Sequence, residues 1–133
     1  MAPNTNHRNY RFSDTLKRLL RRNAIPNIRK ILARTHPVDL ALSLDAFLPQ
    51  ERLKLLSYVG DDSRQAEVIA CMPVAKSVDL LHEISLERAA QLLSSMSGDD
   101  RADILGALDE EFATKILAAM PAEESDEVTE LLR

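Results

Sequence analysis

The sequence has few of the residues that support thiol chemistry or span membranes. One of its 133 residues is a cysteine, Cys71, so no disulfide can close within the chain and no thiolate cluster can hold structural zinc. We expect Cys71 to be a small buried hydrophobe, because it occupies an apolar helical position. No apolar run approaches the roughly 18 to 20 residues of a membrane span, and the N-terminus lacks the apolar segment of a signal peptide.

Motifs that carry catalysis are also scarce. The three glycines, Gly60, Gly98 and Gly106, form neither a Walker loop nor a dinucleotide-binding fingerprint. None of the three histidines is spaced as a zinc pair, and we interpret all three as solvated or helix-capping side chains. The sequence therefore predicts a protein that is not an enzyme.

Charge is divided unevenly along the chain. Residues 1–35 hold nine Lys and Arg against one acid, Asp14, and carry +8, whereas residues 36–133 carry −12. The net charge of −4 therefore hides a basic arm attached to an acidic body. Such asymmetry indicates that one part or both contact a partner.

The acidic body is built from a twelve-residue repeat. When the sequence is divided from Pro37 onward, each unit opens with Pro, Asp or Ser, and the eighth and twelfth positions are apolar in fifteen of sixteen cases. The eighth position holds Leu44, Leu56, Val68, Leu80, Leu92, Ile104, Ile116 and Val128. The eighth, ninth and twelfth positions lie on one stripe of an α-helix, and strand-like alternation is absent.

Each unit is therefore predicted to form one helix of about nine or ten residues, which is too short to be stable without neighbours. Ser85, Ser97 and Asp109 each precede first-turn acids, as N-cap residues do. The predicted fold is all-α, a right-handed superhelical stack of short helices (an α-solenoid) with at least seven helices after Pro37. Because aromatic residues make up only 4% of the chain, the core should be aliphatic.

The chain is expected to have three parts. Residues 1–12 form a disordered basic tail, residues 13–35 form basic helices over Ser13 to Arg22 and Ile25 to Ala33, and residues 36–133 form the repeat domain. An anionic membrane surface suits such an arm, because its headgroups attract Lys and Arg beside an amphipathic helix. An acidic surface of the same protein and a solvated cap on the helix stack are the alternatives. Nucleic acid is not expected as a partner, since the arm has no RNA-binding signature and the acidic body would repel phosphates.

Acidic residues provide a candidate ligand site. Asp99 and Asp103 are four residues apart on one predicted helix, so their carboxylates can lie side by side, with Asp100 next to them. Glu67 and Asp103 share the seventh position of their units. Such carboxylates can be ordinary caps and solvating charge. Alternatively, they can bind a hard cation, Mg²⁺ or Ca²⁺, in a site assembled from separate helices, since no EF-hand loop is present.

Two segments carry a family resemblance. The run HPVDLA at 36–41 and the run SGDDRAD at 97–103, together with short helices joined at Leu-Pro, Met-Pro and Ile-Ser-Leu-Glu junctions, resemble the cytosolic N-terminal domain of the MgtE family of magnesium channels and transporters. The similarity extends from about Leu16 to the C-terminus. The most specific parts are the His-Pro-x-Asp-Leu start and the Asp-Asp-x-x-Asp segment.

The resemblance implies a function for the acids. In that family the domain precedes two CBS domains and a transmembrane pore and acts as a Mg²⁺ sensor, in which Mg²⁺ bridges acids of this domain to acids of the CBS domains and favours the closed pore. Matching positions make Glu67, Asp99 and Asp103 the expected ligands, with Asp100 as a further candidate. The resemblance also implies a homodimer formed through other parts of the parent protein, at the cytoplasmic face of the inner membrane. We therefore expect this sequence to be a fragment of a larger membrane protein.

A second family offers an alternative. The stack of short helices resembles, more weakly, the helical domains of the flagellar motor switch protein FliG, where the stack is a scaffold for protein interaction without metal sensing. An ion-independent helix stack would favour that interpretation.

Overall fold

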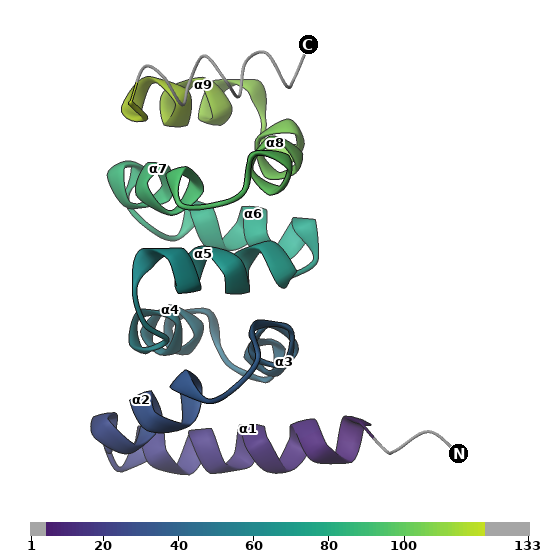
Figure 1. The fold of residues 1–133 in the computed structure, drawn as a ribbon, viewed down its shortest axis with the longest axis vertical. Coiled ribbons are helices and arrows are strands. Elements are labelled where there is room, and N and C mark those ends of the chain that lie inside the picture. Colours follow the sequence, from purple (N-terminus) through teal and green to yellow (C-terminus); the bar gives the residue numbers. More distant parts are fainter. Residues whose placement is uncertain (1–4, 122–133) are drawn as a thin grey trace. The chain divides into compact units, whose positions relative to one another are not determined.

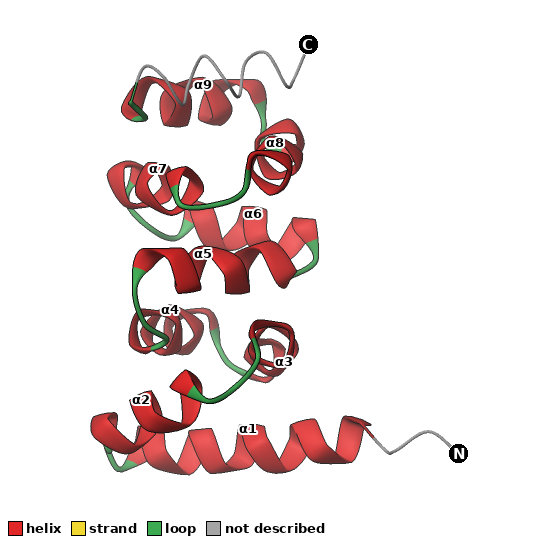
Figure 2. Cartoon of the chain, viewed as in Figure 1, coloured by secondary structure: helices red, strands yellow, loops and turns green. Residues whose placement is uncertain are grey.

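The computed structural model describes the backbone of residues 5–121 and the side chains of residues 11–121. This part of the chain is helical, with short loops and no strand (Figure 2). It forms two compact units that divide after Val68. The first unit holds α1 (Thr5–Arg21), α2 (Ile25–Ala33), α3 (Pro37–Ser43), the 3₁₀ turn η1 (Leu44–Ala46) and α4 (Pro49–Tyr58). The second unit holds α6 (Val74–His82), α7 (Leu86–Ser94), α8 (Gly98–Ala107) and α9 (Glu110–Ala119). Helix α5 (Asp62–Cys71) crosses the division.

The twelve-residue period correctly predicts the helices of the repeat. From Pro37 onward the described chain has seven α-helices of seven to ten residues, so the all-helical class is confirmed. The eighth position is buried in every described unit, at Leu44, Leu56, Val68, Leu80, Leu92, Ile104 and Ile116. The last unit, which opens with Pro121, lies almost wholly outside the described residues.

Within each unit, a helix packs on the helix after next. In the first unit α1 contacts α3 and α2 contacts α4, and in the second unit α6 contacts α8 and α7 contacts α9 (Figure 1). This pattern is typical of a stack in which every short helix buries its apolar stripe against its neighbours. The right-handed superhelical course stays a prediction that is consistent with this packing.

The predicted capping residues begin their helices. Ser85, Ser97 and Asp109 accept hydrogen bonds from the backbone N–H groups three residues later, at 3.1, 3.3 and 2.7 Å. The ring of His36 accepts one from Val38 at 3.2 Å at the start of α3, as expected for a capping histidine. Each cap satisfies a backbone donor that the helix itself leaves unpaired.

The first helix is longer than predicted. It begins at Thr5, eight residues before the expected start at Ser13, so residues 5–12 are helical and the predicted tail of residues 1–12 is not disordered there. No glycine or proline lies between Pro3 and Pro26, so nothing in the sequence stops the helix from extending toward the N-terminus. Residues 1–4 lie outside the described part of the chain.

Two apolar positions face solvent against expectation. Cys71 is exposed, because the eleventh position lies roughly 110° from the centre of the buried stripe when each residue advances the helix by 100°. Leu48 is 60% exposed and lies in an extended conformation just before Pro49, at the start of α4. Other residues at the twelfth position are buried although each lies just beyond the end of its helix, namely Met72, Met96, Leu108 and Met120.

The fifth position holds buried polar residues that the apolar pattern does not reveal. Gln65, Ser77 and Arg101 are each less than 8% exposed. Gln65 donates to the carbonyl of Gly60 and Ser77 to that of Ile69, both at 2.8 Å. These side chains donate to carbonyl groups near the ends of helices, where the regular helical bonding pattern stops.

Candidate functional site

The acidic segment of the second unit is held at the N-terminus of α8. Ser97 begins this helix by accepting the N–H of Asp100, which places Asp99 and Asp100 in the first turn and Asp103 one turn later. Carboxylates in the first turn are stabilised by the positive end of the helix dipole. The local sequence therefore fixes three aspartates within two turns of one short helix.

The position of each aspartate in the repeat determines its exposure. Asp99 and Asp103 occupy the third and seventh positions, roughly 150 to 170° from the centre of the buried stripe, and both are exposed. Asp100 occupies the fourth position, roughly 90° from that centre, and is half-buried. Because side chains four apart on a helix are neighbours, Asp99 and Asp103 share the solvent-facing side of α8.

A buried arginine in the same motif does not serve these acids. Arg101 directs its guanidinium to the end of α7, where Nε donates to the carbonyl of Leu93 at 2.8 Å and Nη2 donates to those of Ser94 and Met96 at 3.1 and 2.9 Å. Within residues 99–103, the side chain of Arg101 is therefore buried, whereas Asp99 and Asp103 are exposed. Sequence reasoning missed this role, although the fifth position lies within the buried stripe of the helix, so a charged residue there was a signal.

Glu67 lies on a different helix. It is exposed on α5, whose start is capped by the Asp61 carboxylate accepting the N–H of Arg64 at 3.0 Å. Glu67 belongs to the first unit, whereas the three aspartates belong to the second. Each unit therefore presents its own exposed acids.

The described residues do not assemble a complete metal site. In residues 11–121 no three His, Cys, Asp or Glu side chains converge closely enough to hold an ion. Carboxylate oxygens are nevertheless the ligands that Mg²⁺ prefers, and Mg²⁺ keeps several waters while binding one or two carboxylates. Asp99 and Asp103, which are exposed on the same side of α8, have this ligand type.

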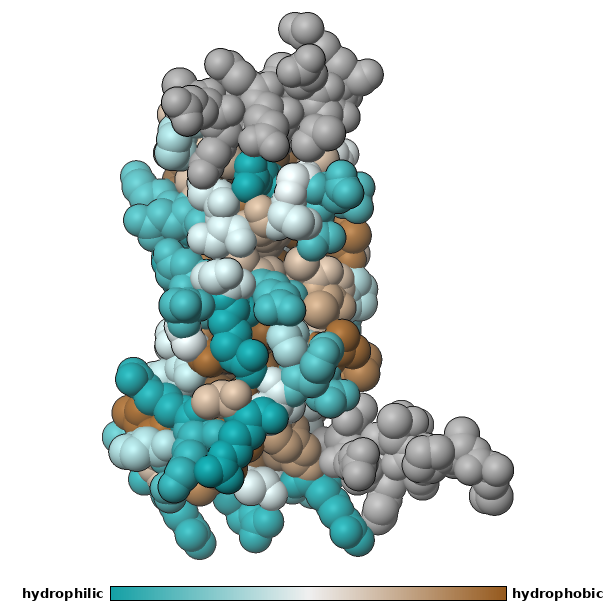
Figure 3. Space-filling view, viewed as in Figure 1, coloured by the Kyte–Doolittle hydropathy of each residue, from teal (hydrophilic) through white to brown (hydrophobic). Residues whose placement is uncertain are grey.

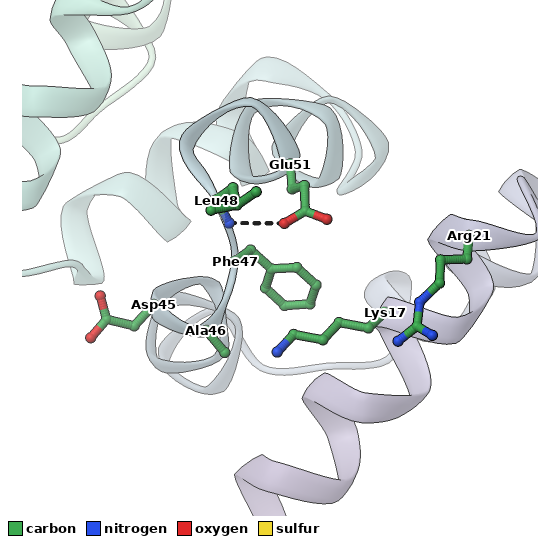
Figure 4. A pocket seen from close by; sticks show the side chains of 7 residues that line it. All are labelled: Lys17, Arg21, Asp45, Ala46, Phe47, Leu48 and Glu51. Carbon is green, nitrogen blue, oxygen red and sulfur yellow. Dashed lines mark hydrogen bonds between the residues drawn. The ribbon is translucent and has the colours of Figure 1, made fainter.

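A pocket of about 520 Å³ lies in the first unit, beside α1 and η1 (Figure 4). The ammonium of Lys17 lies 5.7 Å from the ring centroid of Phe47, a cation–π distance. Glu51 accepts the N–H of Leu48 at 2.9 Å and so caps α4. The pocket is lined by Lys17, Arg21, Asp45, Ala46, Phe47, Leu48 and Glu51. Its mixed charge marks no single ligand class.

Comparison with known proteins identifies the family of this chain. The family model of the MgtE intracellular N domain matches residues 35–133, about three-quarters of the chain. The chain belongs to this family. The family match includes both the start of the repeat and the DDRAD segment of α8, and it favours the MgtE interpretation over the FliG-like scaffold. No curated protein sequence matches the chain.

Two solved structures have the same fold. One is described as the soluble part of a magnesium transporter, with 22% identity and a TM-score of 0.84 over 94% of this chain and 49% of that one. The other is described as the cytosolic domain of the Mg²⁺ channel MgtE in complex with ATP, with 23% identity and a TM-score of 0.80 over 91% and 50%. The chain thus spans about half the length of each of these two structures. None of its described helices is long and apolar enough to cross a membrane.

Proposed function

We propose that this MgtE N domain is a regulatory Mg²⁺ sensor of a magnesium transporter or channel. Its acids would share Mg²⁺ ions with acids of the CBS domains of the same polypeptide, and this bridging would favour the closed pore. Membership of the MgtE N-domain family supports the proposal, together with the solvent-facing position of Asp99 and Asp103 on α8. The parent protein would be a homodimer with this domain at the cytoplasmic face of the inner membrane.

The mechanism follows from charge. Residues 36–133 carry −12, so a second acidic surface that approaches them is repelled unless a cation lies between the two surfaces. Repulsion is weakly screened where the interface excludes water. A drop in Mg²⁺ would therefore separate the domains, and a rise would draw them together.

Asp99 and Asp103 would supply the first ligands, with Asp100 beside them and Glu67 contributing from α5. Mg²⁺ demands about six oxygens in octahedral geometry and gives up its waters reluctantly. The carboxylates of one helix cannot provide that set, so the CBS domains and retained waters would complete it. The site would accordingly bind tightly only when both halves are present.

Limited proteolysis of the whole cytosolic region, CBS domains included, across a Mg²⁺ titration tests this proposal. We expect Mg²⁺ to protect the wild-type protein and the variant Asp99→Asn/Asp103→Asn to require more Mg²⁺ for equal protection. The matched control is Glu87→Gln/Glu110→Gln, which removes the same charge from exposed first-turn positions on α7 and α9. Equal protection of the wild type with and without Mg²⁺ would overturn the sensor function and favour an ion-independent scaffold.

A further inference from the structure

The helices α1 and α2 form a hairpin whose outer surface is strongly basic. We call residues 11–34 the basic hairpin. They include one acid, Asp14, and seven exposed cations, namely Arg11, Arg18, Arg21, Arg22, Arg29, Lys30 and Arg34. Figure 3 shows hydrophilic side chains projecting from the side of α1 that faces away from α2 and α3. The family match begins at residue 35, so the hairpin lies outside it.

The turn between the two helices is well defined. Asn23 adopts a left-handed conformation with φ of 55°, and the N–H groups of Asn23 and Ala24 donate to the carbonyls of Leu20 and Leu19, both at 3.0 Å. These two bonds form a Schellman motif, which ends α1 and reverses the chain. The hairpin interior is filled by Leu16, Ile28 and Leu32, all at most 1% exposed. The cations are consequently fixed on the outside of an ordered element.

An apolar groove runs between α1 and α2 on this basic surface. It has a volume of about 350 Å³, and its apolar part is formed by Leu19 and Ile31. Lys30 and Arg34, which are exposed and four residues apart on α2, stand at its rim. Thr15 and Asn27 complete the lining. The groove thus combines an apolar floor with two cations.

We propose that the basic hairpin binds the surface of an anionic phospholipid bilayer. Its cations would pair with headgroup phosphates, and the groove would take the apolar part of one lipid beside its headgroup. A polynucleotide offers phosphates but no aliphatic chain, so it matches the cations and leaves the apolar floor of the groove unused. The lipid therefore matches more of the observed surface.

The contact is peripheral and electrostatic. Apart from Pro26 and Ala33, the apolar residues of the hairpin are buried or half-buried, so no continuous apolar face remains for deep insertion. Each Lys or Arg near an anionic surface strengthens binding, and the attraction decays within a Debye length. Binding should therefore depend steeply on salt, and it requires no Mg²⁺.

Co-sedimentation of the chain with vesicles in Mg²⁺-free buffer tests the proposal. We expect partition onto vesicles of phosphatidylcholine mixed with phosphatidylglycerol, little onto phosphatidylcholine alone, and release as salt rises from about 0.1 M to about 1 M. The variant Lys30→Glu/Arg34→Glu should reduce the partition coefficient about tenfold or more. The matched control, Lys54→Glu/Lys115→Glu, changes the net charge equally at exposed sites on α4 and α9 and should change partition far less.

Three results would overturn the proposal. One is the absence of binding to anionic vesicles at low salt by wild-type chain that circular dichroism shows to be helical. Another is an equal loss of partition in the hairpin variant and its control, which would indicate a net-charge effect. The third is tighter binding to duplex DNA than to the vesicles, which would assign the hairpin to nucleic acid. Because Mg²⁺ is omitted throughout, none of these results bears on the sensor function.

Discussion

Arg101 on α8 donates its Nε–H to the carbonyl of Leu93 on α7 at 2.8 Å, with its side chain 6% exposed. Two further bonds, to Ser94 and Met96, direct the guanidinium at the C-terminal end of α7. The last carbonyls of a helix lack intrahelical partners and carry the negative end of its dipole. The buried guanidinium of Arg101 thus caps the C-terminal end of α7 and connects it to α8, the helix that carries Asp99 and Asp103.

Replacing this arginine should destabilise the fold. Arg101→Met removes three charge-assisted hydrogen bonds to carbonyls at the end of α7, so we expect a loss of about 2 to 4 kcal/mol in the free energy of unfolding. Lys115→Met is the control, because its ion pair with Glu111 is exposed and should contribute less than about 0.5 kcal/mol. Urea unfolding followed by circular dichroism measures both. Equal losses would show that Arg101 has no special structural role.

Two leucines can test which positions of the repeat face the core. Leu92, at an eighth position, is 1% exposed, whereas Leu42 on α3 is 55% exposed. Leu92→Ala should cost about 2 to 5 kcal/mol of stability, and Ile104→Ala a similar amount, because each leaves a cavity in the core. Leu42→Ala should stay within about 0.5 kcal/mol. A loss below that value at Leu92 would show that the stripe was assigned to the wrong face.

Two glycines should respond to alanine in opposite directions. Gly60 has φ of +149°, and a Cβ there would lie 3.3 Å from Cδ of Arg64, so Gly60→Ala should destabilise the protein by about 1 kcal/mol or more. Gly106 lies within α8 and is exposed, so Gly106→Ala should raise stability by about 0.5 to 1 kcal/mol. Thermal melts of the two variants beside the wild type make the comparison. A stabilised Gly60→Ala variant would contradict the required backbone conformation.

Mg²⁺ should bind weakly to this chain by itself. The aspartates of α8 supply too few of the roughly six oxygens that Mg²⁺ requires, so calorimetric titration should show millimolar or undetectable affinity. The double variant Asp99→Asn/Asp103→Asn should keep the helical spectrum, since both side chains are exposed. Micromolar binding by the wild-type chain would show that the site is complete within it and would contradict the shared-site mechanism.

The sequence predicts the helices better than it predicts the site. The period of twelve locates the helices and their buried eighth positions, because an apolar stripe is required wherever a short helix must pack. Capping at Ser97 and Asp109 can be predicted because Ser and Asp are preferred N-cap residues. By contrast, the burial of Arg101 depends on carbonyls from another helix, which no periodicity reveals. Asp99 and Asp103 are exposed as expected, but a site that they share with Glu67 or with CBS acids depends on contacts beyond a single helix.

The packing of each helix on the helix after next affects how the domain folds. Because α6 meets α8 and α7 meets α9, the contacts that define the core join residues close together in the chain. Proteins rich in such short-range contacts close only small loops on the way to the native state and fold in microseconds to milliseconds. An array of this kind can also begin to fold at any point and grow in either direction. The helix that carries Asp99 and Asp103 can therefore become ordered as soon as its near neighbours have emerged during synthesis.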